Sequence, residues 1–154
     1  MRPSFATVLG LVSLGLGRDW VKDPWKLTEG CFHVSYECED AQTVAGRGDN
    51  PSVAEYIARL VDKLPEDTVY KSGEHIICYQ YSNGPAGFCL FFEGLDKGAT
   101  RNKRDIKAAI PVLLEVSPSR ECKGRCGEAR AHGDTRNGLL KLDYVGEHSC
   151  EGIC

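Results

Sequence analysis

Eight cysteines and four histidines are the residues of this chain best suited to covalent or metal chemistry. Two cysteine pairs have three residues between their members, and two histidines lie near them. These residues are Cys122 and Cys126, Cys150 and Cys154, with His132 and His148. Thiolates and imidazoles at short spacings can bind zinc, whereas the same cysteines form disulfides in an oxidising compartment. The choice between the two chemistries depends on where the protein resides.

The first seventeen residues have the pattern of a secretory signal peptide. Arg2 supplies a positive start, Phe5 to Leu16 is mostly apolar, and Gly15 and Gly17 place small side chains before a cleavage site. The apolar run is shorter than the roughly 20 residues that span a bilayer. We therefore predict a signal peptide at residues 1–17, no integral membrane segment, and a secreted, extracellular domain at residues 18–154.

Secretion favours disulfides, because an even number of cysteines in an oxidising compartment indicates a covalent framework. All eight cysteines lie in the predicted mature chain. A zinc site remains the chemical alternative, and metal analysis with a count of free thiols would separate the two. We expect no metal and no cofactor.

Two helices are predicted between the cysteines. Ser52 and Glu55 match a capping box, and the apolar residues of Ser52 to Leu64 recur at helical spacing until Pro65 ends the helix. A second helix is predicted from Asn102 to Glu115, where Pro111 should kink or shorten it.

Strands are predicted where aromatic and β-branched residues cluster between turn residues, at Gly30 to Tyr36, Glu74 to Tyr81, Phe88 to Glu93 and Leu139 to Val145. The turn Ser82 to Gly87 makes the second and third of these a hairpin. In the last strand, leucines alternate with Lys141 and Asp143, which predicts one face in solvent. The elements together predict an α+β fold, an antiparallel sheet packed against two helices, preceded by an N-terminal extension at Arg18 to Leu27.

The charge distribution offers one candidate target-binding surface. The chain has a formal net charge of −3, yet basic residues predominate from Lys97 to Lys141. We name as the basic cluster the residues around the start of the second helix, Lys97, Arg101, Lys103, Arg104 and Lys107. A solvated helix end is the plain alternative for this cluster. We expect no nucleic-acid partner, because the chain is acidic and has no recognisable binding module.

No catalytic pattern stands out. The chain lacks a Gly-X-Ser-X-Gly nucleophile elbow, and no free cysteine is marked as a nucleophile. Paired carboxylates for glycoside hydrolysis stay open among 22 acidic residues. We expect a protein without enzymatic activity, with a small secreted hydrolase as the alternative.

Several segments occur in a recognisable order over residues 28–150. They are Gly30-Cys31, Cys38, the helix Ser52 to Leu64, Gly73 to Cys78, Gly87-Phe-Cys-Leu-Phe-Phe-Glu93, the helix through Leu114, Cys122 to Gly127, and Gly138 to Val145 with Cys150. In that order they resemble the killer-toxin-four family, small secreted cysteine-rich proteins of fungi. The resemblance implies an α/β sandwich. It also implies a toxin that binds a cell-surface protein or ion channel without enzymatic chemistry, because the founding member of the family blocks calcium uptake.

The resemblance also implies a pairing of the cysteines. From the family order we favour Cys31–Cys122, Cys38–Cys126, Cys78–Cys150 and Cys89–Cys154, each of which closes a long loop. The rival arrangement pairs Cys78 with Cys89 across the hairpin and Cys150 with Cys154 locally.

The chain departs from the family at a lysine that is functionally important in the family's founding member. That place, just before Cys78, is held here by His75-Ile76-Ile77, and the nearest lysine is Lys71. His75 is therefore a further candidate target-binding residue, with a charge only below its ordinary pKa of about 6.5. We expect a monomeric fungal toxin-like or effector protein that acts on a competing or host cell. A host-directed virulence effector on the same scaffold is the alternative.

Overall fold

The computed structural model describes residues 25–27, 35, 38, 52–80, 85–116, 126–131, 137–148 and 150–154. The predicted signal peptide at residues 1–17, and the predicted strand at residues 30–36 apart from Ser35, lie outside these residues. Cys31 and Cys122 lie outside them as well.

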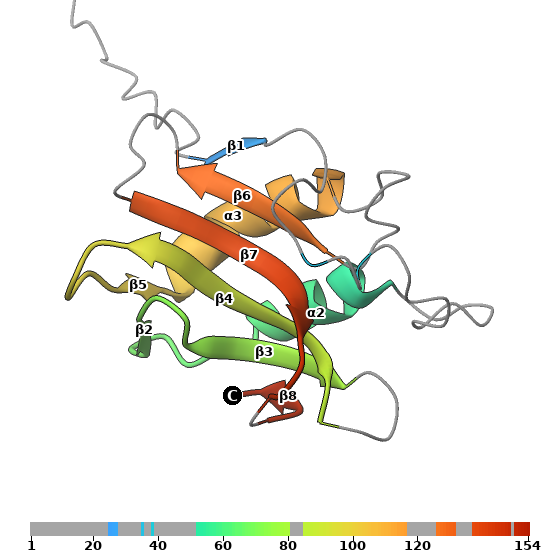
Figure 1. The fold of residues 1–154 in the computed structure, drawn as a ribbon. Helices are drawn as coiled ribbons and strands as arrows, with labels where there is room; N and C mark the ends of the chain where they lie inside the picture. Colours follow the sequence, from blue (N-terminus) through green and yellow to red (C-terminus); the bar gives the residue numbers. More distant parts are fainter. Residues whose placement is uncertain are drawn as a thin grey trace, which may run out of the picture.

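Six strands form one sheet, in the order β1-β6-β7-β4-β3-β8 (Figure 1). In this order they are Trp25–Leu27, Gly127–Ala131, Asn137–Val145, Gly87–Leu95, His75–Gln80 and Gly152–Ile153. Every neighbouring pair is antiparallel. The strands β2 (Val69–Tyr70) and β5 (Arg101–Asn102) form a separate two-stranded sheet. The three predicted strands that lie within the described residues correspond to β3, β4 and β7.

The helices α2 (Val53–Val61) and α3 (Lys103–Val116) lie on the same face of the sheet (Figure 1). The core between the two layers includes Phe88, Leu90, Phe92, Leu140 and Leu142 from the strands, and Val53, Ile57, Ile106, Ala109 and Leu113 from the helices. The predicted α+β fold, an antiparallel sheet against two helices, is confirmed.

The helix α2 begins where its capping box predicts. The Ser52 hydroxyl accepts a hydrogen bond from the Glu55 backbone N–H, and the Glu55 carboxylate accepts one from the Ser52 N–H. Two otherwise unpaired backbone donors are thereby satisfied. The helix ends at Val61, short of the predicted Leu64, whose side chain is nevertheless buried.

The helix α3 begins with a similar reciprocal pair. Asn102 Oδ1 accepts from the Arg104 and Asp105 N–H groups, and Asp105 Oδ2 accepts from the Asn102 N–H. Pro111 is exposed, and the helix continues past it to Val116. The helix predicted from Asn102 to Glu115 is confirmed, and of the two effects expected of Pro111, a kink or a shortening, the shortening does not occur. In the described parts of the chain, neither helix has the length and apolarity of a membrane span.

Candidate functional site

The face of the sheet away from α2 and α3, here called the second face, carries buried charges and disulfides. Side chains alternate between the two faces along a strand. Because Leu140 and Leu142 belong to the core, Lys141 and Asp143 lie on the second face. Their register partners share it: Cys89 lies opposite Asp143, and Glu128 lies opposite Lys141.

Lys141 is the centre of an ionic network on this face. Its Nζ lies 3.1 Å from Asp143 Oδ2 and 3.3 Å from Glu93 Oε2, and its side chain is only 9% exposed. Burial by itself lowers the pKa of Lys141, but the hydrogen bond and charge of Asp143, together with Glu93, outweigh it and raise that pKa. Lys141 is therefore held as a buried cation. The prediction of a solvent-exposed face at Lys141 and Asp143 is wrong.

Asp143 also fastens a distant segment to β7. Its Oδ1 accepts hydrogen bonds from the Ser35 N–H at 2.7 Å and the Tyr144 N–H at 2.8 Å, and lies 3.2 Å from Cys38 Sγ. Cys38 is itself joined to Cys126 by a disulfide. The carboxylate is thus occupied by intramolecular donors, as expected of a structural anchor.

Glu128 and Arg130 add an ion pair on β6 to the charges of this face. Glu128 is almost fully buried, and its Oε1 lies 3.3 Å from Nη2 of Arg130, whose side chain is 41% exposed. At the other side of Lys141, the side chain of Glu93 is 51% exposed. Glu93 and Arg130 are therefore the members of this network that a partner molecule could contact.

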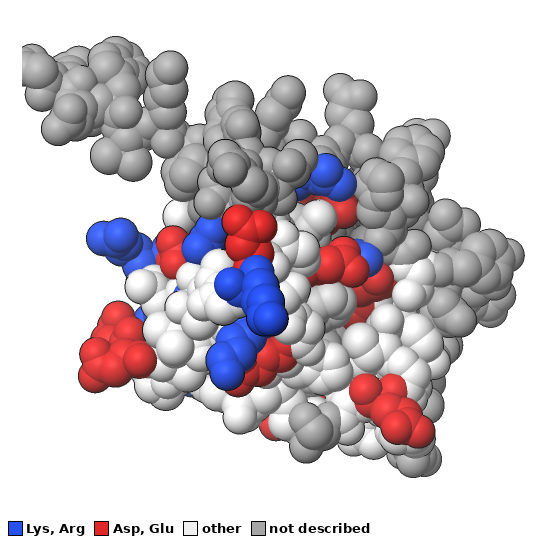
Figure 2. Space-filling model, turned by 60° about the vertical axis from the view of Figure 1, so that its left-hand side comes forward, with Lys and Arg blue, Asp and Glu red and all other residues white. Residues whose placement is uncertain are grey.

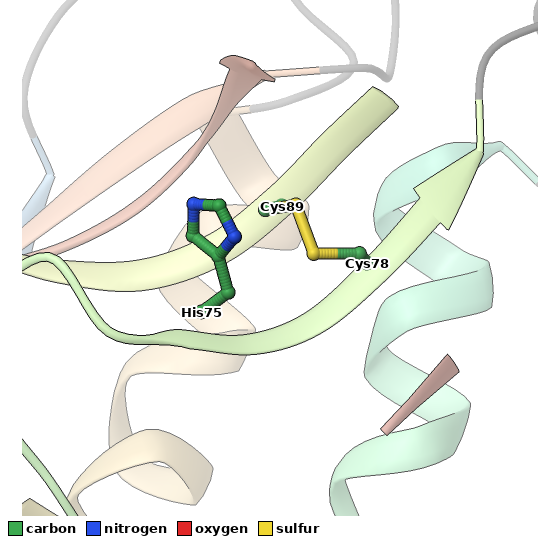
Figure 3. Close-up of side chains that lie close together, drawn as sticks. All are labelled: His75, Cys78 and Cys89. Carbon is green, nitrogen blue, oxygen red and sulfur yellow. A yellow bond between two sulfur atoms is a disulfide. The ribbon is translucent and has the colours of Figure 1, made fainter. Parts of the chain in front are cut away.

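A cluster of sulfur atoms lies at the β3 side of the second face. Cys78 and Cys89 are directly opposite in the register of β3 and β4 and form a disulfide, with the His75 ring beside it (Figure 3). Cys150 and Cys154 form another, and Cys154 Sγ lies 3.7 Å from Cys78 Sγ. Ligand atoms of His75, Cys78 and Cys89, and of Cys78, Cys150 and Cys154, approach within 4.8 Å in two groups. Their sulfurs are in disulfides, so they are not the thiolates that zinc prefers.

These disulfides correct half of the favoured pairing. Cys38–Cys126 is the pair that the resemblance implies. Cys78–Cys150 and Cys89–Cys154 are wrong, since the structure has the rival pairs Cys78–Cys89 and Cys150–Cys154. Loop length favoured the long-range pairs, but strand register places Cys78 and Cys89 with their Cα atoms 4.1 Å apart, within bonding reach. Cys31–Cys122 lies outside the described residues.

His75, the further candidate target-binding residue, lies partly buried beside the Cys78–Cys89 disulfide (Figure 3). Its ring packs against Phe91 with centroids 5.9 Å apart. Burial, and then the neighbouring charge of His148, lower the pKa of His75 below its ordinary value. His75 is therefore neutral in the folded protein except in acid.

The basic cluster is divided by the fold. Lys103 Nζ is buried and donates to the carbonyl oxygens of Asp62 and Leu64 and to Glu66 Oε1. Lys107 pairs with Asp62 at 2.7 Å. Lys97, Arg104 and Lys107 are exposed, Lys107 within this ion pair, and Arg101 is partly buried.

Acidic groups also lie among the basic ones at the surface around β2 and β5 (Figure 2). Figure 2 brings that side of the molecule forward and shows basic and acidic groups interspersed among the described residues. The inward position of Lys103 had a signal in the sequence: it lies three residues before Ile106, on the buried face of the helix.

The charged network of the second face was missed altogether. Lys141 and Asp143 alternate with leucines, which usually indicates solvent exposure. Glu128 lies in Gly127–Ala131, a strand without the aromatic or β-branched residues that predict one. No signal in the sequence identifies Glu93 as the partner of Lys141, or Arg130 as the partner of Glu128.

Comparison with known proteins adds no family. No protein-family model matches the chain, and no curated protein matches it.

Proposed function

We propose that this protein is a secreted, extracellular toxin-like or effector protein that binds a cell-surface protein or ion channel of a competing or host cell. It acts through a rigid surface rather than through catalysis. The observation that carries the proposal is that every cysteine among the described residues is in a disulfide. Such cross-links belong to oxidising compartments, and rigidity lowers the entropy that a binding surface loses on association.

The arrangement of the charges favours binding over catalysis. A general acid or base must reach the proton of its substrate. Lys141 is instead held between two carboxylates, and Asp143 accepts from backbone donors on two segments. These groups stabilise the scaffold and leave the exposed charges at its edges for a partner.

The proposed contact surface consists of the exposed residues of the basic cluster outside the Lys107–Asp62 ion pair. These residues are Lys97 and Arg104. Arg104 precedes Asp105, whose carboxylate accepts a hydrogen bond from the Asn102 N–H at the start of α3. Two cations, one on a turn and one at a helix start, suit an anionic patch of a membrane protein, because charges at the rim of an interface speed association.

The test uses oxidised protein secreted from the full chain, labelled fluorescently and added to intact fungal cells and plant protoplasts. Binding, calcium uptake and growth are measured against protein that has been reduced and alkylated. Lys97→Ser/Arg104→Ser removes the proposed contact. Arg59→Ser/Lys63→Ser removes two exposed cations on and beside α2 and is the matched control.

We expect saturable binding that requires the disulfides, a weakening in Lys97→Ser/Arg104→Ser, and no change in the control variant. Equal binding by both double variants would remove the basic cluster from the contact surface. Absence of saturable binding by the oxidised protein to both cell types would contradict the proposed function.

A further inference from the structure

The disulfides Cys78–Cys89 and Cys150–Cys154 are in contact with each other, although they differ in exposure. Cys78 and Cys89 are completely buried, whereas Cys154 is exposed and Cys150 is partly exposed. Cys154 Sγ and Cys78 Sγ are 3.7 Å apart, which is van der Waals contact between two sulfurs. A thiol in solution can reach the exposed disulfide only, but that disulfide touches the buried one.

The backbone keeps Cys154 in this position. The Cys154 N–H donates to the Ile76 carbonyl oxygen at 2.9 Å, and Ile153 and Gly152 pair with Ile77 and Cys78 in the β3–β8 ladder. These contacts hold the Cys154 sulfur beside Cys78 independently of the Cys150–Cys154 bond. Opening that bond would therefore leave the Cys154 sulfur at its target.

We propose that Cys150 captures a low-molecular-weight thiol, and that Cys154 completes the capture by transferring the exchange to Cys78. The proposal concerns a covalent site at β8 and is independent of the binding surface proposed above. Thiol–disulfide exchange needs a thiolate and access to a disulfide sulfur, and both steps here supply them.

The reaction balances without a net oxidant or reductant. The external thiolate attacks Cys150 Sγ, forms a mixed disulfide there, and breaks the bond to Cys154, whose sulfur leaves as a thiolate. The Cys154 thiolate then attacks Cys78 Sγ, forms Cys78–Cys154, and breaks Cys78–Cys89. Cys89 leaves as a thiolate and takes up the proton that the external thiol lost. Two disulfides and one thiol enter the reaction, and two disulfides and one thiol leave it.

The second step makes the capture persist. After a simple exchange, the freed Cys154 thiolate would attack the mixed disulfide on Cys150 and expel the captured thiol. Bonding of Cys154 to Cys78 removes that nucleophile. It also ties β8 covalently to β3, a connection that the initial disulfides do not make.

Peptide mapping of the full oxidised protein tests the proposal. Tryptic cleavage at Lys71, Lys97 and Lys141 gives two peptides, Ser72 to Lys97 with one disulfide and Leu142 to Cys154 with the other. The protein is incubated with reduced glutathione, blocked with N-ethylmaleimide, digested without reductant and analysed by mass spectrometry. We expect one cross-linked product of the two peptides, with glutathione on Cys150 and the maleimide on Cys89.

The variant Cys150→Ser provides a second test without added thiol, because Cys154 is then a free thiol from the start. We expect the cross-link between the two peptides and loss of the Cys78–Cys89 bond. Cys150→Ser/Cys154→Ser is the matched control and should keep Cys78–Cys89. Non-reducing electrophoresis verifies that the cross-link lies within one chain, and circular dichroism verifies the fold.

Glutathione on the Leu142 to Cys154 peptide without a cross-link would overturn the relay, and no incorporation of glutathione would overturn the capture. Cys150→Ser with maleimide on Cys154 alone would contradict the transfer to Cys78. The wild-type experiment stands even if a variant fails to fold. No target cell takes part, so these results are distinct from a failure of the binding function.

Discussion

The ammonium nitrogen of Lys103, at the first turn of α3, donates a hydrogen bond of 2.8 Å to the carbonyl oxygen of Leu64, beyond the end of α2. It also donates to the Asp62 carbonyl at 2.9 Å and to Glu66 Oε1 at 2.6 Å. One side chain thus satisfies two backbone acceptors just beyond the end of α2. Lys103 belongs to the scaffold, although its neighbours in the sequence lie at the surface.

Replacement of Lys103 by methionine should lower the free energy of unfolding by about 1–3 kcal/mol, because it leaves carbonyl acceptors without a donor at a partly buried junction. Arg104→Met, on the exposed face of the same helix, should stay within about 0.5 kcal/mol of the wild type. Urea denaturation measures both variants. Equal stability of the two would contradict the structural role of Lys103.

Replacement of Asp143 by alanine should be among the most damaging single changes, at about 3–5 kcal/mol, since it leaves the buried Lys141 cation without its main partner. It also removes the acceptor of the Ser35 N–H. Glu93→Ala, at the exposed side of Lys141, should cost less than about 1 kcal/mol. A ranking of these two variants by chemical denaturation checks the network, and a larger loss in Glu93→Ala would contradict it.

His75 should make the protein less stable in acid. Its pKa is lowered in the folded state, first by burial and then by His148, so below about 6.5 the unfolded chain binds the proton more readily. The free energy of unfolding should therefore fall as the pH decreases from about 6.5 towards the folded-state pKa, and level off below it as regards this residue. His75→Leu should show a smaller fall over the same range in urea denaturation.

An NMR titration gives the matched measurement for His75. In His148→Gln, the pKa of His75 should move up towards its ordinary value, because the neighbouring positive charge is gone. A His75 pKa above the ordinary value in the wild-type protein would contradict the account.

Gly87, at the start of β4, should not tolerate a side chain. A Cβ there would lie 2.5 Å from the His148 ring and 2.6 Å from the Tyr79 carbonyl oxygen. Gly87→Ala should cost about 1–3 kcal/mol through overpacking. Gly146→Ala is the control, because no atom lies within 4 Å of its Cβ position, and it should stay within about 0.5 kcal/mol. Thermal unfolding of the two variants measures this difference in stability.

The elements that the sequence predicts correctly carry their signals locally. The capping box of Ser52 and Glu55 defines the start of α2, and the apolar residues of β4 and β7 indicate strands without reference to their partners. The strand β6 differs, because Gly127–Ala131 has little strand propensity of its own and is extended by its pairing with β1 and β7. Pairing with the neighbouring strands overrides local propensity there, and a single sequence does not reveal which strands pair.

The disulfide pairs and the buried charges likewise cannot be predicted from the sequence of one strand at a time. Loop entropy favoured long-range cysteine pairs, but the antiparallel register sets Cys78 against Cys89. Alternation assigned Lys141 to solvent, whereas Asp143 and Glu93 neutralise it in a buried position. In both cases the outcome depends on which residues meet across strands, and the composition of one strand does not reveal that.

The proposed function requires export of the protein followed by oxidation of its cysteines. The decisive measurement is the redox state and location of the protein when the full chain is expressed in secreting eukaryotic cells. We expect it in the medium, with an N-terminus near Arg18, no cysteine that reacts with a thiol reagent, and Cys38–Cys126, Cys78–Cys89 and Cys150–Cys154 in its peptide map. Protein that stays inside the cells with reactive cysteines would contradict the account.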